Sequence, residues 1–112
     1  MMVTPGKGNN FQRRRVAGGT SLSTTGAAVT APYWVKLVRF ADTITAYQSG
    51  DGNTWSKVGT ETITMPAGVL VGLAVSSHFS TTLATATFDQ ITIRPPDVSE
   101  LPPGVLPSPC GT

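Results

Sequence analysis

Carboxylates are the first side chains in this chain that could do chemistry. Cleavage of a glycosidic bond requires two carboxyl groups that face each other across the bond, one as acid and the other as nucleophile or base. Ahead of its proline-rich C-terminal end, the 112-residue sequence offers Asp42, Asp51, Glu61 and Asp89. The first two fall at expected turns, Glu61 lies near an expected strand start, and Asp89 lies on a late strand. Their spacing therefore predicts no acid–base pair.

Nucleophilic and cofactor chemistry have no better support in the sequence. His78 is the only histidine and follows Ser76-Ser77 at an expected strand end, where a hydrogen-bonding surface role is more typical than a general base. The GKG at residues 6–8 lacks the strand, glycine-rich loop and helix of a phosphate site. Cys110 is the only cysteine, so it has no disulfide partner in the chain, and we expect a free thiol. We expect no catalytic residue and no cofactor.

The stretch SGDGNTW, residues 49–55, resembles the Asp-box of sialidases and related propellers, although it lacks one spacer and occurs once. As a calcium loop it offers Asp51, Asn53 and nearby carbonyl or hydroxyl oxygens, whereas calcium takes 6–8 oxygen ligands. Asp51-Gly52 between two alternating runs is a strong hairpin signal, and a type I′ turn needs positive φ at both residues. We therefore predict a hairpin turn here and no metal site.

Carbohydrate binding suits these residue types better than catalysis does. A sugar presents an apolar C–H face and a rim of hydroxyls, which calls for an exposed aromatic ring with planar polar groups beside it. Arginine supplies a fork of donors for that rim. The alternative interpretation is packing for Trp34 and Trp55 and solvation for the arginines. The candidate sugar-binding residues are Arg13, Arg15, Tyr47, Trp55 and His78.

The net charge and the length of the apolar runs limit the classes of partner that the sequence predicts. Eight Lys and Arg against six Asp and Glu give a net charge of +2, which is too small to predict a nucleic acid or an anionic membrane as partner. The basic run Arg13-Arg14-Arg15 is also shorter than a typical polyanion-binding block. No apolar run approaches the ~18 residues of a membrane span, and the start lacks a signal-peptide layout. We expect no nucleic acid and no membrane span.

The hydrophobic pattern that must position these residues is almost entirely β. Residues 1–4 already look like a strand, and Pro5-Gly6 marks a turn after them. Residues 33–48 form two alternating runs around Ala41-Asp42, and residues 84–93 alternate again. Residues 69–77 are nearly continuously apolar, as in a strand covered on both faces. Short strands separated by glycine and proline turns predict an all-β sandwich or barrel. From Arg94 onward six prolines oppose sheet pairing, so we expect a fold over 1–93 and a linker or tail over 94–112.

Five segments resemble, in order, the C-terminal half of concanavalin A-like lectin/glucanase modules of large secreted bacterial proteins: VTPGKGNNFQRR, APYWVKLVR, TAYQSGDGNTWSKVG, ITMPAGVLVGLAVSSH and TATFDQITI. The resemblance implies an antiparallel jelly-roll sandwich outside the cell. The Glu-x-Asp-type pair on one strand of the glucanases in this superfamily is absent. Such modules usually carry a comparable length of strands before the TPGKG segment, so the resemblance implies a partial module with unpaired edges.

These observations together predict a non-catalytic, carbohydrate-associated binding module of a secreted or cell-surface protein, with a polysaccharide or other glycan as partner. One alternative is a structural unit that pairs with other chains through its sheet edges. A second alternative is a fragment of a glycoside hydrolase. Unpaired edges also predict self-association, or pairing with the missing half of the module.

Overall fold

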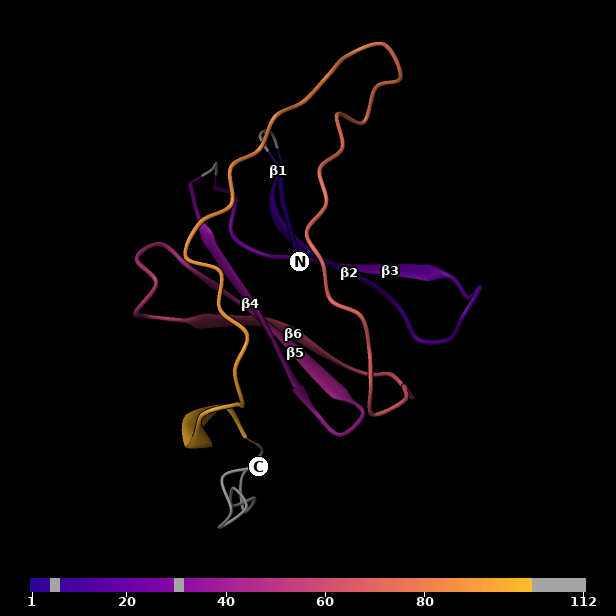
Figure 1. Cartoon of the computed structure of the whole chain (residues 1–112), viewed down its shortest axis with the longest axis vertical. Coiled ribbons are helices and arrows are strands. Elements are labelled where there is room, and N and C mark those ends of the chain that lie inside the picture. The colour runs from indigo at the N-terminus through magenta and orange to yellow at the C-terminus, as the bar shows by residue number, and fades with distance from the viewer. Residues whose placement is uncertain (5–6, 30–31, 102–112) are drawn as a thin grey trace.

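The computed structural model describes residues 1–4, 7–29 and 32–101 (Figure 1). Within these ranges every strand belongs to one of two three-stranded antiparallel sheets, and the only helical element is the short 3-10 turn η1 (Val98–Glu100). None of the described residues forms a helix that is long and apolar enough to cross a membrane. The prediction of an all-β chain is confirmed.

The first sheet has the order β1 (Met2–Thr4), β2 (Gly8–Arg14) and β3 (Ser21–Thr25). The prediction of a strand at the very start is confirmed, with Val3 opposite Asn9. The expected turn at residues 5–6 lies outside the described part of the chain. Gly8 opens β2 at φ +70, and a Cβ there would lie 2.1 Å from the carbonyl oxygen of Ala27, so only glycine fits this position.

The second sheet has the order β4 (Trp34–Phe40), β5 (Thr43–Ser49) and β6 (Ser56–Thr62). It confirms the prediction of two strands around Ala41-Asp42, because Phe40 pairs directly with Thr43 across that two-residue link. Ala41 adopts φ 52, the left-handed conformation that such tight hairpin links require. The hairpin predicted at Asp51-Gly52 is also present, as the β5–β6 connection.

The two sheets contact each other through β2, β3 and β6 around a small core. Phe11 and Ala46 are buried, and a methyl group on Gly59 would lie 3.4 Å from Phe11 Cδ2. Hydrogen bonds cross the same interface, because Gln48 Oε1 accepts from Asn9 Nδ2 at 3.1 Å and from the Ala27 N–H at 2.8 Å. Polar contacts therefore hold the sheets together alongside a modest apolar contact.

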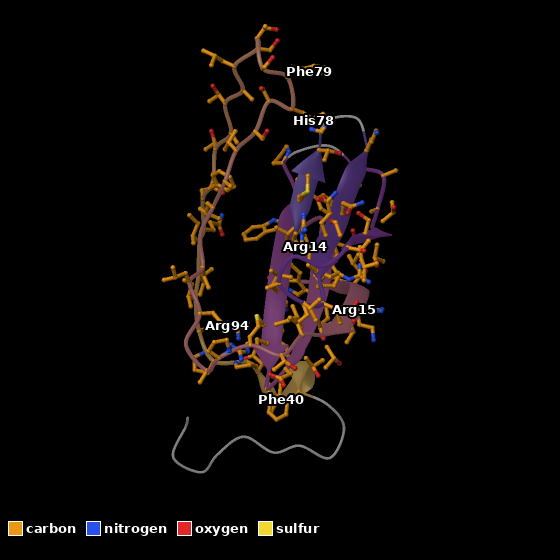
Figure 2. The ribbon with its side chains drawn as sticks, turned by 90° about the vertical axis from the view of Figure 1, so that its right-hand side faces the viewer. Arg14, Arg15, Phe40, His78, Phe79 and Arg94 are labelled. Carbon is orange, nitrogen blue, oxygen red and sulfur yellow. The ribbon has the colours of Figure 1, made fainter. Side chains whose placement is uncertain are left out.

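Residues 69–77 and 84–93 do not form strands in this structure, contrary to the prediction. Figures 1 and 2 show the segment 69–93 running alongside the sheets without joining either one. Its apolar side chains are exposed, with Leu70 at 102% and Leu83 at 99% of full exposure. The sequence pattern is that of strands, but a strand is stable only where a neighbouring backbone pairs with it, and this chain places none there. The expected burial of 69–77 on both faces is wrong for the same reason.

The beginning of the predicted tail is folded against the second sheet. Arg94 forms ion pairs with Asp97 at 3.2 Å and with Glu100 at 3.2 Å, which close residues 94–100 into a compact turn. Glu100 in turn pairs with Lys36 of β4. Residues 102–112, including Cys110, lie outside the described part.

Candidate functional site

Lys36, Tyr47 and Trp55 meet on one face of the β4–β5–β6 sheet, and we call these three residues the Lys36 platform. Lys36 lies directly opposite Tyr47 in the β4–β5 register. Its Nζ is 4.9 Å from the centre of the Tyr47 ring and 4.3 Å from the centre of a Trp55 ring. A cation held against two aromatic faces is stabilised by their quadrupoles. The platform therefore combines two half-buried rings with a fixed positive charge.

The SGDGNTW segment positions Trp55 through hydrogen bonds of its own. Ser49 Oγ accepts from the N–H groups of Asp51 at 3.2 Å and Gly52 at 2.9 Å. Asp51 Oδ1 accepts from the N–H groups of Asn53 and Thr54, both at 2.8 Å. Asp51 does not have positive φ, so the predicted type I′ geometry is wrong, although Gly52 at φ +80 is left-handed as expected. An aspartate that bonds the N–H groups ahead of it builds a wider loop than a two-residue turn.

Trp34 supports the platform from beneath the loop. Its ring meets Trp55 edge to face, with centroids 6.5 Å apart and planes at 84°. A Cβ on Gly52 would lie 2.8 Å from Trp34 Cε2, so the loop backbone lies directly on the indole. The packing interpretation of Trp34 agrees with this contact. The edge-to-face contact also agrees with the packing interpretation of Trp55.

The Asp51 carboxylate accepts hydrogen bonds from the backbone of its own loop. The N–H groups of Thr54 and Asn53, with the Ser49 hydroxyl, hold the pKa of Asp51 below its ordinary value. An oxygen that already accepts several hydrogen bonds has little capacity left for a cation or a substrate proton. Among the described residues there is no group of three or more His, Cys, Asp and Glu side chains arranged to hold a metal ion.

A hollow of about 290 Å³ opens beside Tyr47 on the same sheet face. Its lining mixes apolar groups with hydroxyls, and the hydroxyls of Thr45 and Thr60 lie 3.2 Å apart across the strands. Lys57 contributes a positive charge to the lining. The remaining lining residues are Val38, Phe40, Thr43, Ser99, Glu100 and Leu101. The hollow thus offers an aromatic wall, hydroxyls and one cationic side chain in one place.

Glu100 brings a buried carboxylate to this site from the folded start of the tail. Its side chain is only 7% exposed, and Oε2 lies 2.6 Å from Lys36 Nζ. Oε1 accepts from the Asp97 N–H at 2.7 Å and from Arg94 Nη1 at 3.2 Å. Burial opposes the charged form of Glu100, but Lys36, the Asp97 N–H and Arg94 outweigh it and keep its pKa below the ordinary value. Lys36 and Glu100 therefore form an ion pair.

Arg13 and Arg15 are placed elsewhere, around Glu61 of β6. Arg13 Nε donates to Glu61 Oε2 at 3.1 Å, and Arg15 Nε donates to Oε1 at 3.0 Å. Glu61 lies near the end of β6, not at a strand start as expected, and pairs with Ile44, so it points to the face opposite Tyr47. The hydrogen bond from Arg15 is the main cause of a lowered Glu61 pKa, with Arg13 also lowering it and burial opposing. The two arginines lie on the same side, as expected. That side faces the contact between the two sheets, where both arginines bond Glu61.

His78 lies apart from the other candidates. It sits at φ 65 in the loop of the exposed segment, next to Phe79, whose ring centroid is 6.1 Å away. Figure 2 places His78 at the opposite end of the molecule from Phe40, which lines the hollow. Of the five predicted sugar-binding residues, the structure brings Tyr47 and Trp55 together at the platform, gathers Arg13 and Arg15 around Glu61, and leaves His78 apart.

Two residues of the site were missed by sequence reasoning. Lys36 could have been found, because the two-residue link at Ala41-Asp42 fixes the register and places residue 36 opposite residue 47. Glu100 carries no comparable signal, since it follows a proline-rich stretch that favours an extended tail.

In comparisons with known proteins, no family model, no curated protein and no solved structure matches this chain. The functional argument therefore depends on the geometry of the site.

Proposed function

We propose that this chain is a non-catalytic carbohydrate-binding module and that the Lys36 platform, with its adjoining hollow, is the glycan site. The observation that carries the proposal is the juxtaposition of Tyr47 and Trp55 around Lys36 on one sheet face. Aromatic rings stack on the C–H faces of sugars, while threonine hydroxyls and ammonium groups bond the hydroxyl rim. The hollow, at about 290 Å³, is at the small end of the range of ligand pockets.

The contacts of two carboxylates also favour a binding role over catalysis. Asp51 is bonded by its own loop, and Glu61 is paired with two arginines. Both carboxylates make structural contacts, and these contacts are not those of an acid–base pair that faces a bond to be cleaved. The finer fold that accompanies the proposal is a partial, concanavalin A-like sandwich, supported by the contact between the two sheets. A secreted or cell-surface location belongs to the same proposal and derives from the sequence resemblance.

Affinity electrophoresis in gels that contain single polysaccharides tests this proposal. We expect one polymer to retard the chain and both Tyr47→Ala and Trp55→Ala to reduce the retardation at least severalfold. Phe79→Ala is the matched control, because it removes an exposed aromatic ring at the far end of the molecule. Circular dichroism checks that each variant remains folded. The proposal fails if no polymer retards the chain, or if Phe79→Ala has the same effect as the platform variants.

A second candidate function is assembly, and the exposed segment 69–93 favours it. The segment has the alternating pattern of strands, its apolar side chains face solvent, and β4 is an edge strand with Val35 and Leu37 exposed. Unpaired strands and open sheet edges on the same chain are complementary, so a second copy can supply the missing backbone partner. In this proposal the module is a structural unit that pairs through its edges.

Light scattering over a range of protein concentrations tests assembly. We expect a mass above that of the monomer and expect Leu70→Glu or Leu83→Glu to reduce it, because a charge in a strand interface is costly. Both leucines are fully exposed in the single chain, so neither change disturbs its own core. Thr81→Glu in the same exposed segment is the control. A monomeric mass at every concentration would rule out self-assembly.

A further inference from the structure

We infer that Glu100 acts as an internal ligand of the Lys36 platform, and that the platform's external ligand is a sugar bearing a carboxylate, of the hexuronic acid class. This inference rests on the proposed glycan site and goes beyond it, because it names the chemical class of the sugar and a segment of the chain that competes with it.

The contact between Glu100 and the platform has the form of a bound acidic ligand. The Glu100 carboxylate is almost fully buried and lies 2.6 Å from Lys36 Nζ, which the rings of Tyr47 and Trp55 flank. Residues 99–101 line the hollow beside Tyr47. The segment thus presents a carboxylate to the cation, and its neighbouring residues form one wall of the hollow.

The charge on the platform explains why the ligand should be anionic. Lys36 is only 20% exposed on its side chain, so its ammonium has lost much of its hydration. Lys57 lines the same hollow and adds a like charge. A neutral sugar that displaced Glu100 would leave the partly buried Lys36 ammonium uncompensated, which is costly. A uronic acid replaces the carboxylate that it displaces, and its ring can stack on Tyr47 or Trp55.

Displacement is feasible because the segment is held mainly by its own contacts. The contacts of Arg94 with Asp97 and Glu100, and that of the Asp97 N–H with Glu100, lie within residues 94–100. The ion pair that ties this turn to the sheet is Lys36–Glu100. Exchange of one carboxylate for another therefore conserves the main electrostatic contact. The tethered Glu100 competes as an intramolecular ligand, and its occupancy lowers the apparent affinity for the sugar.

The test uses polygalacturonate and its fully methyl-esterified form, which share a backbone but differ in charge. Affinity electrophoresis and isothermal titration calorimetry measure the dissociation constants of the full chain. If Glu100 occupies the site about nine-tenths of the time, Glu100→Gln should tighten polygalacturonate binding about tenfold. The methyl ester should bind more weakly than the acid form to both the wild type and this variant. Lys36→Met should abolish the preference for the acid form, whereas Lys7→Met, which removes the same charge from an exposed site, should retain it.

Two results would overturn the inference about the ligand. Unchanged binding of polygalacturonate by Glu100→Gln would show that Glu100 does not compete. An equal loss with Lys7→Met and Lys36→Met, or equal binding of dextran sulfate, would show general attraction of a cationic chain for a polyanion. If the methyl ester binds as well as the acid and depends on Tyr47, this inference fails while the proposed glycan site stands. If neither polymer nor any neutral polysaccharide is bound by the wild type or by Glu100→Gln, both fail.

Discussion

Gln48 should be the most sensitive polar position in the contact between the two sheets. Its Oε1 accepts hydrogen bonds from Asn9 Nδ2 and from the Ala27 N–H, and both donors come from the β2–β3 side. Asn9 is fully buried, and its Oδ1 has no hydrogen-bond partner among the described residues. Replacement of Gln48 by methionine keeps the volume of the side chain but removes the acceptor. Two donors are then left without a partner at a buried contact.

The expected cost follows from those two donors. A buried donor left unpaired costs about 1–3 kcal/mol, so Gln48→Met should destabilise the fold by about 2–4 kcal/mol when partial solvent access is allowed for. With a urea dependence of about 2 kcal/mol per molar, the middle of the range for small proteins, the unfolding midpoint should fall by roughly 1–2 M. Urea unfolding followed by tryptophan fluorescence measures this shift.

Gln12→Met is the matched control, because Gln12 is exposed on β2 and undergoes the same chemical change. Its unfolding midpoint should move by only a few tenths of a molar, as surface substitutions usually do. Equal midpoints for the two variants would refute the argument that the Gln48 amide joins the sheets. A changed urea dependence in Gln48→Met would instead indicate that unfolding is no longer a single transition.

Two further predictions concern Gly52 and Glu61. Gly52→Ala and Gly18→Ala both place a Cβ on a left-handed backbone, but only the Cβ at residue 52 meets the Trp34 ring, at 2.8 Å. Near-ultraviolet circular dichroism should therefore change in Gly52→Ala alone, and equal spectra would contradict the packing of the loop on Trp34. Because the folded pKa of Glu61 lies below its ordinary value of 4.5, its ionised form stabilises the fold above that pH, and this contribution is lost as pH falls through the folded pKa. Thermal midpoints of the wild type and Glu61→Gln should differ near neutral pH and converge on acidification; a constant difference would contradict the pairing with Arg13 and Arg15.

The strands that sequence reasoning located are those that local pattern alone can specify. Residues 33–48 alternate on both sides of a two-residue link, so both strands and their pairing follow from short-range signals. The segment 69–93 has strand patterning too, but a strand also needs a neighbour, and no local pattern supplies one. The same limit explains the loop at Asp51, where side-chain hydrogen bonds to Asn53 and Thr54 decide a geometry that the residue pair alone does not.

The same difference between local signals and long-range contacts separates the site residues that the sequence could suggest from those that it could not. Tyr47 and Trp55 could be proposed because the sequence shows that two aromatic residues flank a predicted hairpin. Arg13 and Arg15 were nominated for their shared strand face, but their partner Glu61 is 46 positions or more away in the chain, and only the contact between sheets reveals it. Glu100 and Lys36 are likewise far apart in the sequence, although they form an ion pair in the structure. Residue types can therefore suggest a binding surface, while long-range pairing decides which charges remain available to a ligand.

The register shift between Ala46 and Tyr47 has a consequence for how this surface tolerates change in length. Ala46 faces Gly59 but Tyr47 faces Lys57, so Val58 is an extra residue in β6. Because neighbours in a strand point to opposite faces, a regular ladder would send Lys57 and Trp55 to the side that packs on the first sheet. With all residues of β6 present, the bulge at Val58 is what keeps Lys57 and Trp55 on the face of Tyr47. Deletion of Val58 would remove the bulge and leave Lys57 opposite Tyr47, whereas deletion of Ser56 would send Trp55 to the other side of the sheet. The effect of a single-codon deletion on this face therefore depends on which side of Lys57 it falls.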